Sequence, residues 1–168
     1  MIRVAVLVIS DSVHQGRRTD LSGVAVCKRL EEIGWSCPIT EVLPDEAGLI
    51  SQRLAALSDA GEVSVILTTG GTGVARRDVT PDATRCVVER EVPGLAELMR
   101  ARGIKSTPMA ALSRAIAGTR GRVLIVNLPG SPKGAVESLD AIVELVPHIL
   151  DLLRGATEHH PAKPGQSI

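Results

Sequence analysis

The sequence predicts a single α/β domain, a three-layer α/β/α arrangement whose central sheet is mostly parallel and doubly wound. Apolar runs rich in β-branched residues at 2–10 and 63–69 are typical of strands buried on both faces. Segments that suit helices alternate with such runs, and this β-α-β-α-β order is typical of doubly wound sheets. The length of 168 residues suits one domain with a substantial core.

The first half of the chain supplies three predicted strands and two predicted helices. Residues 2–10 form the first strand, and Asp20 or Ser22 can cap a helix that reaches about Gly34, because short polar side chains accept hydrogen bonds from the free N–H groups of a helix start. The remaining elements are a weaker strand at 37–43, a helix at 46–60 and a third strand at 63–69.

The second half begins with a helix start at Thr80-Pro81-Asp82, where an N-cap hydroxyl precedes proline at the first helical position and an acid in the first turn. A hydroxyl before proline also predicts a helix at 108–117 capped by Thr107 and another at 132–145 capped by Ser131. A helix at 93–103, a strand at 122–127 and a final turn or helix at 147–153 complete the predicted order.

Composition limits the domain and its partners. Residues 1–154 form the predicted domain, and the polar segment 155–168 is expected to be a mobile tail.

The chain has 19 basic and 19 acidic residues, so no net field draws nucleic acid or an anionic membrane to it. Trp35 is the only aromatic residue, which leaves an aliphatic core and almost no means of stacking bases. The apolar run 4–9 is too short for a membrane span or a signal segment, which favours a cytoplasmic location.

The cysteines and histidines show no metal-binding pattern. Cys27, Cys37 and Cys86 lack the Cys-x-x-Cys arrangement of zinc and redox sites, and we interpret them as buried free thiols. The four histidines also lack a ligand spacing; they are His14, His148, His159 and His160, the last two in the polar tail. None of these side chains is assigned a catalytic role.

The most informative segment is a glycine-rich loop between the strand 63–69 and the helix start at Thr80. It contains Thr69-Gly70-Gly71-Thr72-Gly73 and then Arg76-Arg77-Asp78. Its glycines permit positive φ and can turn backbone N–H groups toward an anion. No Gly-Lys-Ser/Thr follows, and the third glycine of the dinucleotide fingerprint is missing, so both familiar nucleotide motifs are excluded. The loop predicts a site for a phosphorylated ligand, although a solvated surface turn is the alternative for such a cluster alone.

Three loops are expected to meet at one rim of the sheet, because ligands in doubly wound folds bind at the carboxyl ends of the strands. These loops are Asp11-Ser12, 70–78 and 129–133. Helix starts at Thr80 and Ser131 would point free N–H groups into the crevice, which suits two anionic groups. Either residue could instead serve only as a helix cap.

Asp45, Asp78 and Asp82 are the carboxylates nearest this rim, and Mg²⁺ that carries nucleotide phosphates is usually bound through one or two carboxylates. Asp78 precedes the helix cap and is the strongest candidate. Asp82 is also explained by the helix dipole, and Asp45 could be the N-cap of the helix that follows it. Phosphate binding and a solvated surface position are both open for Arg76, Arg77, Arg114 and Lys133.

The run Thr-Thr-Gly-Gly-Thr-Gly at 68–73, followed by Arg-Asp-Val-Thr-Pro at 77–81, resembles the signature of the MogA/MoaB family of molybdenum cofactor biosynthesis proteins. Further matching segments occur in the expected order, so that the resemblance spans roughly residues 2–154. They are Ile9-Ser10-Asp11, Leu43-Pro44-Asp45-Glu46, Val92-Pro93-Gly94-Leu95, Leu112-Ser113-Arg114 and Asn127-Leu128-Pro129-Gly130-Ser131-Pro132-Lys133.

The resemblance implies a molybdopterin adenylyltransferase, which uses Mg²⁺ and ATP to adenylylate the terminal phosphate of molybdopterin and releases pyrophosphate. It implies that Asp45 and Asp78 are catalytic and hold Mg²⁺, with the nucleotide near the glycine loop and Asp11 and the pterin near Ser113 and the loop 129–133. The candidate substrate-binding residues are Asp11, Ser12, Thr69, Gly70, Gly71, Thr72, Gly73, Thr80, Ser113, Asn127, Pro129, Gly130, Ser131 and Lys133. A homo-trimer or hexamer and a partner protein that inserts molybdenum are also implied.

Two departures from the MogA pattern favour an alternative, a MoaB-like protein that binds molybdopterin without turnover. The loop 12–20 is short and lacks a tyrosine-containing stretch, and there is no insertion between Ser138 and Leu152. Both aspartates are nevertheless present, so the sequence leaves the two functions open. A related domain that acts on pyridine nucleotides is a third possibility, but such domains usually accompany a second domain for which this length leaves no room.

Overall fold

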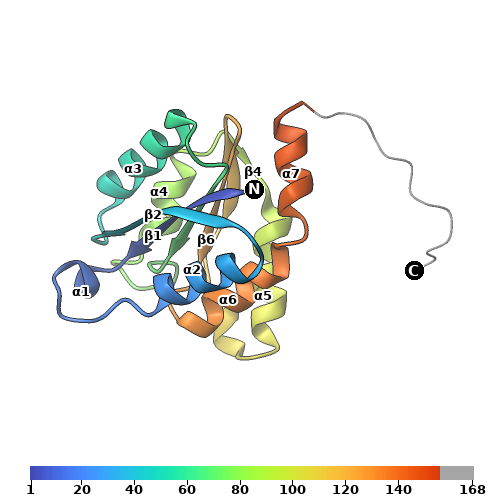
Figure 1. Cartoon of the computed structure of the whole chain (residues 1–168). Coiled ribbons are helices and arrows are strands. Elements are labelled where there is room, and N and C mark those ends of the chain that lie inside the picture. Colours follow the sequence, from blue (N-terminus) through green and yellow to red (C-terminus); the bar gives the residue numbers. More distant parts are fainter. Residues whose placement is uncertain (156–168) are drawn as a thin grey trace.

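The computed structural model describes residues 1–155 and contains a six-stranded sheet in the order β2-β1-β3-β6-β5-β4 (Figure 1). The first four of these strands pair in parallel, while β5 and β4 run antiparallel to their neighbours. The strands are β1 (Arg3–Ile9), β2 (Ser36–Leu43), β3 (Val65–Thr69), β4 (Arg90–Glu91), β5 (Ala117–Arg120) and β6 (Val123–Leu128). The predicted fold class, a mostly parallel doubly wound sheet in one domain, is confirmed.

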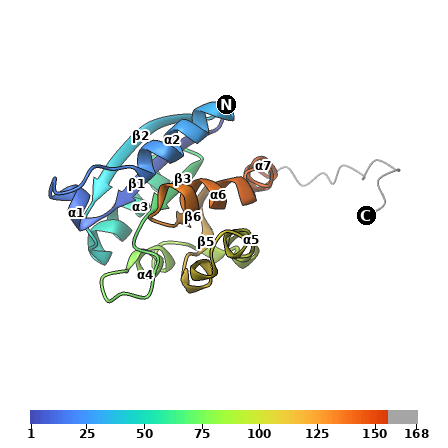
Figure 2. The same ribbon diagram turned by 90° about the horizontal axis from the view of Figure 1, so that it is seen from below.

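Helices cover both faces of the sheet, which gives the three layers (Figures 1 and 2). One face packs against α2, α5, α6 and α7, and the other against α3 and α4. The helices are α1 (Asp11–His14), α2 (Ser22–Glu32), α3 (Ala47–Ala60), α4 (Thr80–Arg85), α5 (Pro93–Ile104), the 3₁₀ helix η1 (Pro108–Leu112), α6 (Pro132–Ile142) and α7 (Val146–Leu153).

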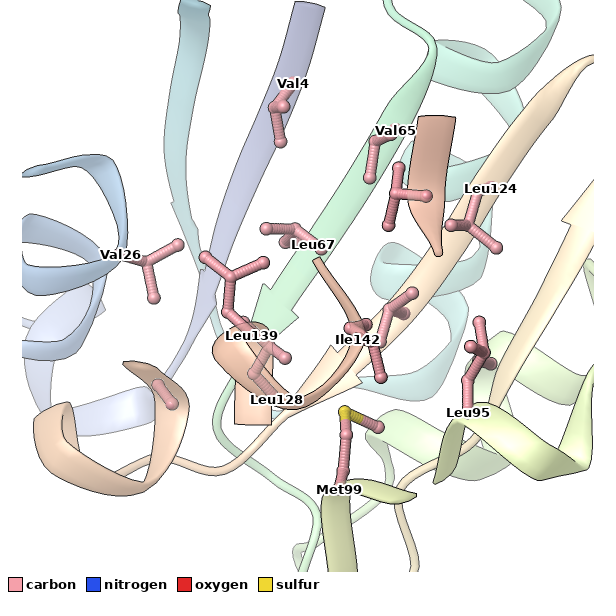
Figure 3. Packing of buried hydrophobic residues seen from close by; sticks show 14 of the residues in the cluster. Val4, Val26, Val65, Leu67, Leu95, Met99, Leu124, Leu128, Leu139 and Ile142 are labelled. Carbon is pink, nitrogen blue, oxygen red and sulfur yellow. The ribbon is translucent and has the colours of Figure 1, made fainter. Parts of the chain in front are cut away.

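The alternation of side chains along β1 divides the core into two clusters. Val4 and Val6 face the cluster beneath α2, α5, α6 and α7, whereas Ala5 and Leu7 face the cluster beneath α3 and α4. Figure 3 shows the first cluster, in which side chains such as Leu67 and Leu139 fill the space between sheet and helices. Because every strand residue from Val4 to Ile9 is buried, the continuous apolar run needs no polar face, as predicted.

The predicted helix over 108–117 is wrong. Only Pro108–Leu112 is helical, as a short 3₁₀ turn capped by the Thr107 hydroxyl, and β5 begins at Ala117. Local propensity in this alanine-rich segment favours a helix, but β5 pairs with β6 in a tight hairpin around Gly121, whose φ is +54°. Pairing with the buried strand β6 therefore overrides the local helix preference.

Other differences are smaller. The sequence did not reveal β4 or the short helix α1, and the helix predicted at 132–145 ends at Ile142. No helix within residues 1–155 combines the length and apolar character needed to cross a lipid bilayer. The prediction of a mobile tail, and with it the pair His159 and His160, falls outside the described residues apart from Gly155.

Candidate active site

The carboxyl ends of four parallel strands are joined at one rim by main-chain hydrogen bonds. The Ser10 N–H donates to the Leu43 carbonyl at 2.9 Å, which joins β1 to β2, and the Gly70 N–H donates to the Leu128 carbonyl at 3.2 Å, which joins β3 to β6. The Thr69 hydroxyl adds a 2.7 Å bond to the Pro129 carbonyl. The three loops expected at this rim therefore meet there, and the end of β2 joins them.

Two glycines make this close approach possible. Gly70 and Gly71 have φ of +105° and +65°, a backbone region that residues other than glycine rarely adopt. A Cβ on Gly70 would lie 2.2 Å from the Ile9 carbonyl oxygen, and one on Gly71 would lie 2.3 Å from the Thr80 hydroxyl. The expectation of positive φ is confirmed for these two residues and wrong for Gly73, where the tight contact is instead with the Asp78 carboxylate, 2.8 Å from a Cβ position.

Asp11 and Asp45 bind each other's backbone in a reciprocal pair. The Asp11 N–H donates to Asp45 Oδ2 at 2.9 Å, and the Asp45 N–H donates to Asp11 Oδ1 at 3.0 Å. Arg77, on the loop that follows Gly71, donates from Nε to Asp11 Oδ2 at 2.7 Å and from Nη2 to the Asp45 carbonyl at 3.2 Å. Asp45 does not cap α3, whose N-cap position is Glu46, so its carboxylate serves the rim instead.

The two aspartates are electrostatically unlike. The Asp45 N–H that donates to Asp11, and then the Arg77 guanidinium, lower the pKa of Asp11. Burial raises the pKa of Asp45, with the Asp11 N–H opposing that rise and the nearby Asp11 and Asp78 carboxylates adding to it. The ionised form of Asp45 is therefore less stable in the folded protein than in water, and a cation in the same cavity would stabilise it.

Arg114 fixes the glycine loop, residues 70–79, from the opposite side. Its backbone N–H donates to the Thr72 carbonyl at 2.8 Å, and its Nε donates to the Gly73 carbonyl at 2.8 Å. Its Nη2 bonds the Asp78 carbonyl and also Asp82 Oδ2, the latter at 2.9 Å. The guanidinium of Arg114 therefore binds acceptors of the loop and of α4, while its side chain stays partly exposed; phosphate binding by Arg114 stays a prediction.

Two cavities flank the glycine loop. The polar cavity, about 280 Å³, lies on the β1 side and is lined by residues that include Ser10, Asp20, Ser22, Asp45, Thr69, Gly70, Gly71, Asp78 and Gly130. The apolar cavity, about 240 Å³, lies on the α5 and α6 side and is lined by residues that include Thr72, Gly73, Met99, Met109, Leu112, Ser113, Pro129 and Ser131. Both candidate catalytic aspartates therefore line the same cavity, and Ser113 lines the other.

Thr80 and Asn127 lie beneath the rim. Thr80 begins α4 without capping it, contrary to prediction, because its hydroxyl turns toward Gly71; the oxygen is buried and has no hydrogen-bond partner among the described residues. Asn127 is fully buried, and its amide donates to the Thr68 and Thr84 hydroxyls at 3.0 and 2.8 Å. Asn127 therefore ties β6 to β3 and α4 and lines neither cavity.

The remaining predicted residues lie at the periphery. The Ser12 hydroxyl bonds that of Ser10 at 3.1 Å, and Lys133 is largely exposed, 3.8 Å from Glu137. Neither lines a cavity, nor does exposed Arg76. Ser131 caps α6 through a 3.1 Å bond from the Gly134 N–H, as predicted, and lines the apolar cavity as well.

Sequence reasoning missed part of both linings. Asp20 and Ser22 were seen only as helix caps; Asp20 does accept from the Gly23 N–H at 2.8 Å, but it also lines the polar cavity. Met99 and Met109 on the apolar side gave no signal, because an apolar lining residue has the same local pattern as a core residue. Within residues 1–155, no three His, Cys, Asp or Glu side chains gather as a complete metal site.

A doubly wound domain with two cavities beside a glycine loop at its carboxyl rim is a small-molecule-binding protein of the α/β class. Comparison with known proteins gives the family. Residues 5–148 match the family model of a probable molybdopterin binding domain, and the chain belongs to this family. The MogA/MoaB resemblance is thereby confirmed.

Individual relatives are similar over most of their length. A molybdopterin adenylyltransferase of Helicobacter pylori is 41% identical over 157 residues, which are 92% of this chain and 89% of that protein. The molybdopterin adenylyltransferase of Escherichia coli K12 is 37% identical over 169 residues, 92% and 86% of the two chains. The crystal structure of the molybdopterin biosynthesis enzyme MoaB from Thermus thermophilus has a TM-score of 0.85 and 50% identity, covering 92% of this chain and 98% of that one.

Gly71→Ala should lower the unfolding free energy far more than the same change at Gly61. Both residues have φ near +70°, but a Cβ on Gly61 meets nothing within 4 Å, whereas one on Gly71 meets the Thr80 hydroxyl and Asp45 Oδ1 at 2.3 and 3.1 Å. Gly61→Ala should cost about 1–2 kcal/mol of unfolding free energy from backbone strain alone. Urea unfolding of both variants measures the difference, and equal losses would show that the contact at Gly71 is unimportant.

Arg114→Lys should loosen the glycine loop, because a lysine ammonium cannot reproduce the planar set of donors. The Arg114 side chain is 38% exposed, so the loss of global stability should be small, on the order of 1 kcal/mol. Trypsin cleavage after Arg76 and Arg77 should accelerate several-fold. The control is Arg85→Lys, which disturbs only the exposed pair with Glu91; acceleration in the control as well would contradict a specific role for Arg114.

Asp45→Asn should stabilise the protein slightly at neutral pH. Because the pKa of Asp45 is raised on folding, stability falls as pH rises through that pKa, and a neutral amide avoids this loss. The gain should vanish in acid, where both side chains are neutral. Asp59→Asn is a control of opposite sign, since Arg120 lowers the pKa of Asp59. Urea unfolding of the wild type and both variants, from neutral pH into acid, measures these differences in unfolding free energy. A lower stability of Asp45→Asn than of the wild type at pH 7 would contradict the raised pKa of Asp45.

Proposed function

We propose that this protein is a molybdopterin adenylyltransferase, which transfers the adenylyl group of ATP to the terminal phosphate of molybdopterin and releases pyrophosphate. The observation that carries the proposal is the pair of cavities on either side of the glycine loop, one polar with Asp45 and Asp78 and one mainly apolar. Curated relatives that are 37–41% identical over most of the chain bear this name, which supports the enzyme over a non-catalytic pterin-binding protein.

The polar cavity suits the nucleotide phosphates. Gly70 and Gly71 line its wall without side chains, and Ser10 and Ser22 add hydroxyls. Adenylyl transfer needs positioning of the attacking phosphate and neutralisation of charge more than covalent help from the protein. Asp11 and Arg77 would act indirectly, because their bonds hold Asp45 and the loop in place.

The residues present fit Mg²⁺. Asp45 and Asp78 supply two carboxylates to one cavity. The Thr80 hydroxyl, which has no hydrogen-bond partner among residues 1–155, lies on the same side of Gly71 as Asp45 Oδ1: a Cβ on Gly71 would be 2.3 Å from the hydroxyl and 3.1 Å from Oδ1. This is an all-oxygen donor set, of the kind that binds Mg²⁺ together with substrate phosphates. When bound, the ion would neutralise phosphate charge, while Asp45 and Asp78 hold it in the cavity.

The apolar cavity suits the pterin. Met99, Met109 and Leu112 offer adaptable apolar surface, and Thr72, Ser113 and Ser131 offer hydroxyls at its edge. A few polar groups in a mostly apolar cavity are typical of sites for small heterocyclic ligands. The phosphate end of such a ligand would extend past Gly73 toward the polar cavity.

The remaining expectations rest on the family resemblance. A homo-trimer or hexamer, a partner protein that inserts molybdenum and a cytoplasmic location stay predictions. Size-exclusion chromatography with light scattering would measure the oligomeric state independently of activity.

The decisive experiment is calorimetry of the purified protein with molybdopterin, followed by addition of Mg-ATP and chromatography for the adenylylated product. Asp78→Asn should lower turnover by roughly 100-fold or more while pterin binding persists. The amide oxygen can still accept from the Ala75 N–H, as Asp78 Oδ2 does at 2.9 Å, so the loop should keep its shape. Asp151→Asn, whose exposed side chain pairs only with Arg154 among the described residues, is the matched control.

Each outcome has a distinct meaning. Unchanged turnover in Asp78→Asn would remove Asp78 from catalysis. Binding of molybdopterin by the wild-type protein without product would favour the non-catalytic protein of the same family. Absence of binding would mean that the cavities take a different ligand.

A further inference from the structure

Two cysteines that are ten residues apart in the sequence face each other at the edge of the sheet. Cys27 on α2 and Cys37 on β2 have their Sγ atoms 3.3 Å apart, and the Thr40 hydroxyl lies 3.4 Å from each sulfur. Both cysteines are half-buried, while Cys86 is exposed. All three cysteines are free thiols, as expected, but the expectation that they are buried is wrong.

The chain path explains why these sulfurs meet. After α2 the chain reverses at Gly34, whose φ is +77°, and enters β2 at the outer edge of the sheet. The register between β1 and β2 shifts between the pairs Arg3↔Ser36 and Ala5↔Ile39. Cys37 lies in this irregular stretch, opposite the helix that carries Cys27, so no regular sequence spacing could have indicated the pair.

The environment makes the two thiols unequal. Either thiol can donate in the contact between the two sulfurs, and this contact lowers the pKa of Cys37 to about 6 and raises that of Cys27. A thiolate, not a thiol, is the attacking species in thiol–disulfide exchange. Cys37 is therefore suited to react first and Cys27 to resolve the product.

We propose that Cys27 and Cys37 form a redox-active dithiol that closes to an intramolecular disulfide with a small disulfide oxidant such as oxidised glutathione. The Cys37 thiolate attacks one sulfur of the oxidant and releases one thiol, leaving a mixed disulfide. Cys27 then loses its proton and attacks Cys37 Sγ, which forms the Cys27–Cys37 bond and expels the second thiol. Two electrons and two protons pass from the protein to the oxidant, and a dithiol reductant reverses the reaction. The proposal does not depend on adenylyl transfer.

Closure would join α2 covalently to the edge strand. The N-terminal end of α2 contributes Ser22 to the polar cavity, so the bond would fix one wall of that cavity from a distance. Trp35 provides an internal reporter, because it lies two residues before Cys37 and packs against the same core cluster as both cysteines. It is the only tryptophan, so its fluorescence reports on this region alone.

The test uses the full chain, reduced and then equilibrated with defined mixtures of reduced and oxidised glutathione, quenched with an alkylating agent and analysed by mass spectrometry. Free thiols should fall from three to one, with the loss of two hydrogen atoms and no retained glutathione on the pair. Tryptic peptides 19–28 and 30–53 should be joined by the disulfide. Trp35 fluorescence should change at the same ratio of reduced to oxidised glutathione as the number of free thiols. The change should reverse with dithiothreitol.

Three variants make the result specific. Cys86→Ser should close as the wild type does and retain no free thiol, whereas Cys27→Ser should stop at a glutathione adduct on Cys37. Cys37→Ser should likewise stop at a glutathione adduct, on Cys27, so that the joined peptides appear only when both cysteines are present. The proposal is overturned if Cys86→Ser keeps two alkylatable thiols in every mixture, or if both cysteines carry glutathione without joining.

Discussion

The close approach of backbone at the carboxyl rim is the constraint on which the site depends. Gly70 lies so near the end of β1 that a side chain there would overlap the Ile9 carbonyl, and Gly130 packs against Gly70 from the β6 side, with its Cβ position 3.3 Å from the Gly70 Cα. Three strands can therefore end side by side with almost no side-chain volume between them. The loops that continue from these strands then lie within reach of both cavities.

Short hydrogen bonds and one ion pair balance the charge of the reciprocal pair at this rim. The reciprocal pair of Asp11 and Asp45 places two carboxylates next to each other, and only Asp11 has a guanidinium bonded to its carboxylate oxygens. Asp45 is left with one backbone donor and partial burial, which makes its charge the more costly of the two. A carboxylate whose charge is costly in this way would be stabilised more by a neighbouring cation than Asp11 would.

The sequence was sufficient to predict the sheet and the rim, because both follow from continuous signals. Buried parallel strands need apolar runs such as 4–9, and the topology then directs the loops to one edge. It was insufficient wherever a distant partner decided the outcome. Residues 108–117 look helical locally, but the helix ends at Leu112 and β5 begins at Ala117 to pair with β6. Thr80 has the pattern of a cap but turns toward Gly71. Asp20 and the pair Cys27 and Cys37 acquire their surroundings only when α2 docks on the sheet.

The two outer strands limit how copies of this chain can associate. At one edge, β2 contains Pro38, which has no N–H to donate, and its register is irregular; at the other edge, β4 has only two residues. Neither edge is a good template for a strand from a second molecule, since proline and very short strands interrupt the ladder of donors and acceptors. Any assembly of this protein is therefore expected to bury helix surfaces, and continuous sheets across subunits are disfavoured, which also protects the chain from edge-to-edge aggregation.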